Sequence, residues 1–226
     1  MKKTFLLILI SLFSAAATFA ETSGDNSTQG RNKYRPNGRT AVRSYLDSYC
    51  SSHIGATFTS ISSENKFLGN NSKTGLNVGF KYGMGVTTSA PLYFELGVSY
   101  VDKGGKVTGN KGKMSYNLNY LELPFALRYI FETSSDLTIQ PFFGGYFACG
   151  VGGSVKNYAT HTVYISFSDR DDAFRRFDGG IQVGCGFAFD LVYADLAYEI
   201  GLANITHDAF NTAHNHGLML SVGVMF

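Results

Sequence analysis

The chain has 226 residues, with 19 Lys and Arg against 17 Asp and Glu, and its charged fraction of 16% lies below the roughly 25% of ordinary soluble proteins. This balance excludes the concentrated basic face that nucleic-acid binding requires. Beyond the N-terminus no run of about 18 apolar residues occurs, which excludes a membrane-spanning helix, while the 26 Gly, 14 Tyr and 19 Phe favour strands.

Residues 1–20 have the pattern of a secretory signal peptide. Lys2 and Lys3 give it a positive start, an apolar stretch follows at 5–13, and small residues precede the cleavage expected after Ala20. Loss of the two lysines leaves as many basic residues as the 17 acidic ones, so we expect a formally neutral mature chain. The signal also predicts export from the cytoplasm.

The next segment, residues 21–43, is rich in Ser, Gly, Asn, Thr and Gln, and we interpret it as a polar periplasmic linker. Residues 44–226 are expected to form one domain. In this part the apolar residues recur at every second position, which is the signature of a strand with two unlike faces. The pattern predicts eight strands, at 52–61, 76–86, 92–100, 121–131, 137–151, 181–189, 192–200 and 218–226.

The connections between these strands alternate in length. Polar segments at 62–73, 102–113, 153–172 and 203–215 are long, whereas those at 87–90, 132–136 and 190–191 are short. Outer-membrane barrels have short periplasmic turns and long external loops in this order. The sequence therefore predicts an all-β fold, an eight-stranded antiparallel up-and-down transmembrane β-barrel located in the outer membrane.

The chemistry of the two faces separates this prediction from a soluble barrel with a ligand cavity. One face is bulky and aromatic on nearly every strand, and the interior of an eight-stranded barrel is too narrow to hold it. Charges exposed to lipid would cost several kcal/mol each. We therefore expect the bulky face to meet lipid and a polar network to fill the lumen, formed by Lys81, Glu95, Glu122, Arg128, Asp178, Gln182, Asp195 and Glu199.

Three segments resemble the PorT-like outer-membrane β-barrel family. They are the strand YLELPFALRY at 120–129, the hairpin at 178–205 that ends in YEIGLANI, and the terminal residues 223–226. The resemblance covers about 52–226. It implies an eight-stranded barrel in the outer membrane, and it implies no activity because most members of that family have none known.

Several residue groups could carry chemistry. The inward acids could pair for acid/base work, but Lys81 and Arg128 favour a neutralised network instead. Imidazoles in the last long connection could bind a metal, although solvated histidines are the favoured interpretation. A basic second connection could contact the anionic headgroups of lipopolysaccharide. The residues concerned are His207, His214 and His216 in the former connection and Lys103, Lys106, Lys111 and Lys113 in the latter.

The chain ends on Phe226, with apolar residues at alternate positions before it. Such an end resembles the signal that the barrel-assembly machinery recognises. Taken together, these features favour a non-enzymatic barrel with no cofactor, acting structurally or through contacts of its external loops. A narrow channel or a transport- or secretion-associated component is the first alternative, and a membrane-embedded enzyme is the second.

Overall fold

The computed structural model describes most of the chain after the N-terminal segment, namely residues 48–63, 71–109, 112–133, 137–167, 174–206 and 212–226. The expected signal peptide and linker lie outside these residues. Within them, no helix has the length and apolar character needed to cross a membrane.

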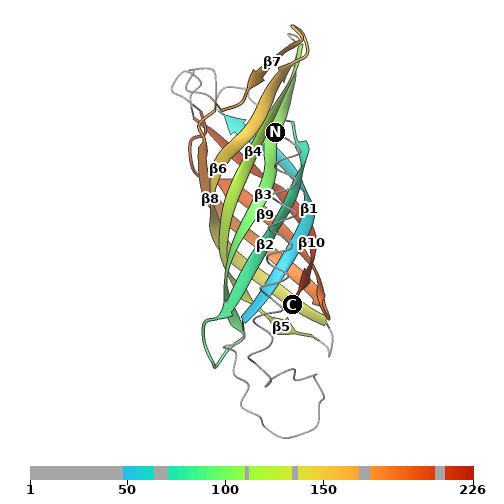
Figure 1. Ribbon diagram of the computed structural model, residues 1–226, viewed down its shortest axis with the longest axis vertical. Coiled ribbons are helices and arrows are strands. Elements are labelled where there is room, and N and C mark those ends of the chain that lie inside the picture. Colours follow the sequence, from blue (N-terminus) through green and yellow to red (C-terminus); the bar gives the residue numbers. More distant parts are fainter. Residues whose placement is uncertain (1–47, 64–70, 110–111, 134–136, 168–173, 207–211) are drawn as a thin grey trace, which may run out of the picture. The chain divides into compact units, whose positions relative to one another are not determined.

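Eight long antiparallel strands of the described residues form a closed ring (Figure 1). Neighbours in the ring follow the order of the chain, and two pairings, β1 with β10 and β4 with β6, close it. This confirms the predicted eight-stranded up-and-down fold. The strands are β1 (Ser48–Ser63), β2 (Lys73–Gly85), β3 (Leu92–Gly109), β4 (Gly112–Tyr129), β6 (Leu137–Asn157), β8 (Phe177–Phe189), β9 (Val192–Gly201) and β10 (Ala213–Met225).

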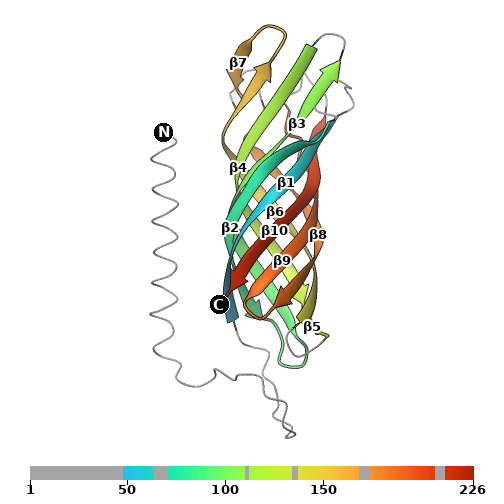
Figure 2. The ribbon, with the colours of Figure 1, turned by 90° about the vertical axis from the view of Figure 1, so that its right-hand side faces the viewer.

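Two short strands are added to this ring. β5 (Phe131–Glu132) and β7 (Thr162–Ile165) each pair with β6, one near each of its ends. The end of the barrel with the tight β8–β9 connection is named the turn end, and the opposite end, which carries β7, is named the extended end (Figure 2).

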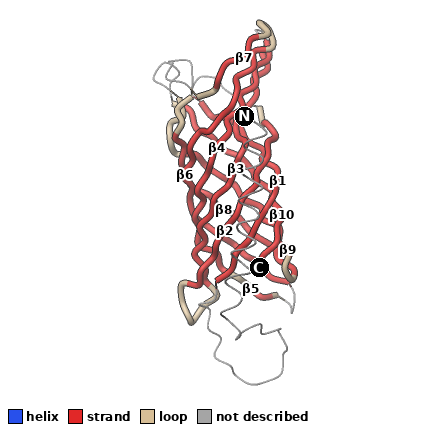
Figure 3. The backbone as a smooth tube through the Cα atoms, viewed as in Figure 1, coloured by secondary structure: helices blue, strands red, loops and turns tan. Residues whose placement is uncertain are grey.

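The extended end differs from the sequence-based expectation. The segments 102–113 and 153–172 were predicted as long polar loops, yet β3 continues to Gly109, β4 begins at Gly112 and β6 continues to Asn157. The prediction fails because the pattern inverts beyond the lipid belt: there the apolar residues, such as Tyr116 and Leu118, face inward and polar residues face outward, so the search for an outward apolar face ends too early. Parts of β3, β4 and β6 (102–109, 112–119 and 152–157) together with β7 form what we name the projecting sheet (Figure 3).

The long strands expose one face and bury the other. In β9, Tyr193, Asp195, Ala197 and Glu199 are buried, whereas Leu196 and Tyr198 between them are exposed and Ala194 is half-buried. The large exposed side chains of the other strands follow the same rule, among them Phe143 at 59% and Phe187 at 50%. The predicted bulky outward face is therefore confirmed.

The lumen contains aromatic side chains as well as the polar network. Tyr120, Tyr146 and Phe142 are buried there. Near the extended end, Phe167 and Phe174 reach inward from the segment after β7, and each ring packs edge-on against a tyrosine of β4. These two rings form an apolar cap over the polar part of the lumen.

Candidate functional site

An ion cluster crosses the lumen towards the turn end. Arg128 of β4 pairs through Nη2 with Asp195 Oδ2 of β9 at 2.8 Å, and through Nε with Glu95 Oε2 of β3 at 3.0 Å. Lys81 of β2 contacts the same Asp195 oxygen at 2.8 Å. Two cations thus balance two carboxylates, as burial of charge requires. These four residues are named the lower ion cluster.

A second cluster lies closer to the extended end. Lys103 Nζ of β3 is 2.7 Å from Glu122 Oε2 of β4 and 2.6 Å from Glu199 Oε2 of β9. The same ammonium lies 3.8 Å from the centroid of the Tyr146 ring, within the range of a cation–π contact. Because β3 and β9 occupy opposite sides of the ring, the contact between Lys103 and Glu199 spans the lumen. Lys103, Glu122 and Glu199 are named the upper ion cluster.

The remaining two predicted lumen residues are also buried. Asp178 of β8 accepts a 2.8 Å hydrogen bond from Asn215 Nδ2 of β10, and that amide also donates to the Tyr120 hydroxyl at 3.4 Å. Gln182 Nε2 donates to the backbone carbonyls of Phe125 and Gly145, at 3.4 Å each. The structure therefore places all eight predicted lumen residues inside the barrel, and it distributes them over several layers instead of one site.

Two contributors to these clusters were missed from the sequence. Lys103 was assigned to the basic loop, although it continues the inward register of Ser99 and Val101 on β3, and that register could have identified it. Tyr49 lies ahead of the strand expected at 52–61, and its hydroxyl donates a 2.6 Å hydrogen bond to Glu95 Oε1. A bulky residue preceding a weak strand gives no comparable signal.

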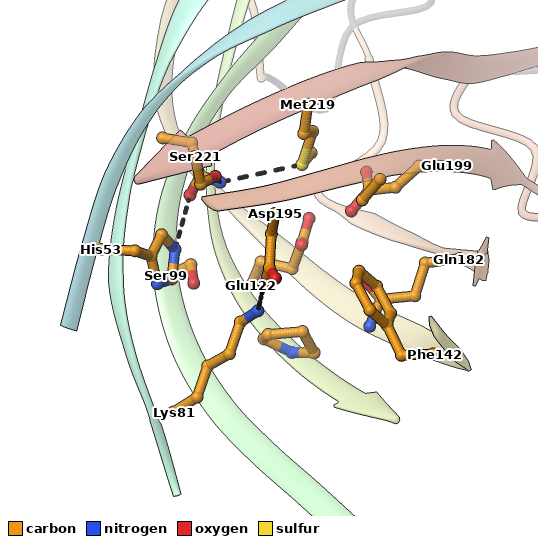
Figure 4. A pocket seen from close by; sticks show the side chains of 13 residues that line it. His53, Lys81, Ser99, Glu122, Phe142, Gln182, Asp195, Glu199, Met219 and Ser221 are labelled. Atoms are coloured by element: carbon orange, nitrogen blue, oxygen red, sulfur yellow. Dashed lines mark hydrogen bonds and ion pairs between the residues drawn. The ribbon is translucent and has the colours of Figure 1, made fainter. Parts of the chain in front are cut away.

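A small cavity separates the two ion clusters. Its volume is about 30 Å³, and side chains of both clusters line it, including Lys81, Asp195, Glu122 and Glu199 (Figure 4). A space of this size has room for about two water molecules and excludes a metabolite-sized ligand. The cavity is therefore a gap between layers of a filled interior.

The predicted histidine group is only partly described. His207 lies outside the described residues. His214 and His216 share the outward side of β10, where His214 Nδ1 lies 2.9 Å from the Ala203 carbonyl oxygen and His216 Nε2 lies 2.9 Å from Ser60 Oγ. Over the described ranges, no group of three or more His, Cys, Asp or Glu side chains is arranged to hold a metal ion.

The geometry of the lumen determines what it can do chemically. Each carboxylate of the two ion clusters is tied to a cation from another strand, so the clusters brace the ring. Side chains of the lower ion cluster, the upper ion cluster and the apolar cap occupy successive levels of the interior. This arrangement stabilises and fills the barrel.

Comparison with known proteins identifies the family. Residues 46–207 match the family model described as outer membrane protein beta-barrel domain, which covers more than half of the chain. The chain belongs to this family. Membership of this family places the protein in the outer membrane, as predicted. The match supports the broad family of small outer-membrane barrels and is not specific for the PorT-like proteins.

Solved structures similar to this outer-membrane barrel include Ail of Yersinia pestis, with 11% identity, a TM-score of 0.43, and coverage of 80% of this chain and 100% of that one. Neisserial surface protein A has 14% identity and a TM-score of 0.45, and the match covers 80% of this chain and 99% of that one. OprG of Pseudomonas aeruginosa has 12% identity and a TM-score of 0.44, and the match covers 81% of this chain and 97% of that one. Values this low give no basis for transferring a ligand or partner. The curated protein sequences contain no match.

Proposed function

We propose that this outer-membrane barrel is a non-enzymatic surface protein that binds another protein through the edge of its projecting sheet. The extended end faces the cell exterior in this proposal, since short turns of such barrels are periplasmic. The ion clusters and the small cavity support a filled scaffold better than a channel or a catalytic centre.

The observation that carries the proposal is the composition of β7. Val163 is 64% exposed, Ile165 is 73% exposed, and Tyr164 between them is 48% exposed, although the strand lies at the far end of the projecting sheet. Among the described strands β7 pairs with β6 alone. An apolar edge strand with an open side is a template for an added strand. The partner we infer is an extended segment of another protein that pairs with this edge.

Site-specific crosslinking in the native outer membrane tests this proposal. A photoreactive amino acid is placed at Ile165, and at Phe143 of β6 as a lipid-facing control that is similarly exposed. We expect one protein adduct of defined mass from position 165 and none from 143. The substitution Val163→Glu should abolish that adduct because it places a charge beside the added strand.

The captured protein is then purified and titrated against the wild-type barrel and the Val163→Glu variant. Binding to wild type with a clear loss in the variant supports the proposal. Adducts with lipid only, or a protein adduct that survives Val163→Glu, would overturn it. Heat-dependent electrophoretic mobility of each variant establishes that the barrel itself has folded.

A further inference from the structure

The outward face of the projecting sheet carries lysines in a defined row. Val107, Met114 and Val155 pack against the interior core, so their neighbours Lys106 and Lys156 lie on the opposite, outward side. Both lysines have Ser115 of β4 as their Cα partner, one from each flanking strand. With strands about 4.8 Å apart, their Cα atoms are about 10 Å apart.

Lys113 extends this row towards the tip. It lies two residues before Ser115 on the same outward side of β4, it is exposed, and its ammonium lies 5.6 Å from the centroid of the Tyr158 ring. Among the described residues, none of the three lysines forms an ion pair. The nearby carboxylate of this face, Asp102, pairs with Lys73. The row therefore presents net positive charge.

Below the lysines the same face changes character twice. Uncharged amide and hydroxyl side chains come first, where Asn117 Nδ2 donates to Ser154 Oγ at 3.3 Å. Apolar side chains follow, including Leu121 at 43% exposure and Val151 at 47%. From lipid outward, the part of the face formed by β3, β4 and β6 is thus apolar, then rich in neutral hydrogen-bonding groups, then cationic, while β7 places the exposed Ile165 and Val163 beside Ser154 and Lys156.

The height of the row decides which anion it fits. Ser115 lies six positions beyond Leu121 on β4, and at about 3.4 Å per residue on a strand tilted by about 40° the row stands roughly 15 Å above Leu121. A phospholipid headgroup layer is only about 5–8 Å thick on each side of a bilayer. A tall headgroup, with sugars between its acyl chains and its anionic groups, reaches this level.

We infer that the outward face of the projecting sheet binds the phosphorylated saccharide headgroup of an outer-leaflet glycolipid. Lys106, Lys113 and Lys156 contact its anionic groups, and the Asn and Ser side chains below them contact its sugars. Val163 of β7 is the Cα partner of Lys156 and lies on the same outward side, so this site borders the strand proposed to bind a protein. Substitution of the lysines leaves the side chains of β7 unchanged and therefore tests the glycolipid site separately.

Titration with lipopolysaccharide tests the inference. The probe is a rough lipopolysaccharide with a phosphorylated core oligosaccharide, and retained molecules per barrel are counted by native mass spectrometry in nonionic detergent. The variant replaces the row by Lys106→Gln, Lys113→Gln and Lys156→Gln, and the matched control carries Lys→Arg at the same positions. We expect roughly tenfold weaker binding for the glutamine variant, because three partly screened charge pairs are lost, and nearly unchanged binding for the arginine control.

Further measurements distinguish the phosphate groups of a glycolipid from those of a phospholipid and from free phosphate. The same lipopolysaccharide after dephosphorylation should bind the wild-type barrel as weakly as the intact form binds the glutamine variant. Inorganic phosphate and phosphatidylglycerol should fail to compete at equal concentration. Equal binding by wild type and the glutamine variant would overturn the site, and effective competition by either small anion would overturn its assignment to a glycolipid. Unchanged heat-dependent mobility of both variants shows that neither result reflects misfolding.

Discussion

Arg128 is 1% exposed, and its guanidinium is held by carboxylates of two other strands. A buried cation of this kind is tolerated only because Asp195 binds it through two nitrogens and Glu95 binds the third. The arrangement does not imply a large net stabilisation, since desolvation offsets much of the attraction. It does mean that removal of one partner leaves the others buried without compensation.

Substitution Arg128→Met is therefore expected to destabilise the barrel strongly. Glu95 loses its cation and Asp195 retains only Lys81, so the free energy of unfolding should fall by about 3–5 kcal/mol. Urea unfolding of barrels refolded into lipid vesicles, followed by tyrosine fluorescence, measures the change. The exposed Lys113 provides the matched control, because Lys113→Met removes a charge without leaving a buried counter-charge.

A compensated variant separates charge from packing. Arg128→Met combined with Glu95→Gln removes one cation and one carboxylate and leaves Asp195 paired with Lys81, so much of the lost stability should return. If the double variant is no more stable than Arg128→Met alone, the loss comes from packing against Phe142, whose ring centroid lies 4.4 Å from the guanidinium carbon. Such a result would contradict the electrostatic explanation.

Individual lumen residues show what could and could not be predicted from the sequence. Asp195 and Glu199 were predicted to face inward because they alternate with bulky apolar residues on a strand that contacts lipid. Their partners were less predictable. Lys103 lies where the outward residues of β3 become polar, so both faces look alike, and Asn215 pairs with Asp178 across a ring that only the closed fold brings together.

At the level of elements, the eight strands and their order follow from period and connection length, but their lengths do not. β3 and β4 continue well beyond the lipid belt, in register from Asp102↔Asn119 to Gly109↔Gly112. Backbone pairing and an apolar inward face that includes Met114, Tyr116 and Leu118 maintain this extension. Below it the bulky apolar residues of β4 face outward, so the alternation changes phase at Tyr120–Leu121 and the lipid-facing pattern alone indicates that the strand ends there.

The extension depends on Gly104. This residue has φ of +133°, and a Cβ atom there would collide with the Tyr116 carbonyl oxygen of the paired strand. Gly104→Ala should destabilise the projecting sheet by about 1–3 kcal/mol, the usual cost of a strained backbone position. Limited trypsin digestion measures it, because Lys106 and Lys113 become cleavable when the sheet opens locally.

Gly152 offers a matched control for Gly104. It belongs to β6 of the same projecting sheet, and a Cβ atom there would have open space around it. Gly152→Ala should leave the digestion rate close to that of wild type. Equal protection of the two alanine variants would show that the sheet tolerates the strain, and the role assigned to Gly104 would then be wrong.

For the whole molecule, assembly and folding are separate properties. Phe226 is predicted to be part of the signal for the barrel-assembly machinery, so Phe226→Ser should lower the amount of barrel in the outer membrane of cells. The purified variant should still refold in detergent and keep its heat-dependent electrophoretic mobility. Phe189→Ser is the control, since this aromatic residue is 62% exposed at the turn end but lies within the chain. A similar loss in both variants would indicate a general need for exposed aromatics.

Ion conduction is a property of the entire lumen, and the structure predicts that it is absent. Lys103 and Glu199 meet from opposite sides of the ring, Arg128 and Asp195 close the next level, and Phe167 packs on Tyr120 nearer the extended end, with ring centroids 5.4 Å apart. These barriers are in series, so any one of them blocks a hydrated ion.

We therefore expect no stepwise conductance in planar bilayers, for wild type or for the Arg128→Met variant. The variant is informative because opening the lower level leaves Lys103 with its two acids and the apolar cap in place. Insertion is verified by recovering the protein from the bilayer preparation and showing that it keeps the heat-dependent electrophoretic mobility of a folded barrel. Regular conductance steps from wild type would favour the channel alternative, and steps from the variant alone would locate the remaining barrier in the lower ion cluster instead of in three successive levels.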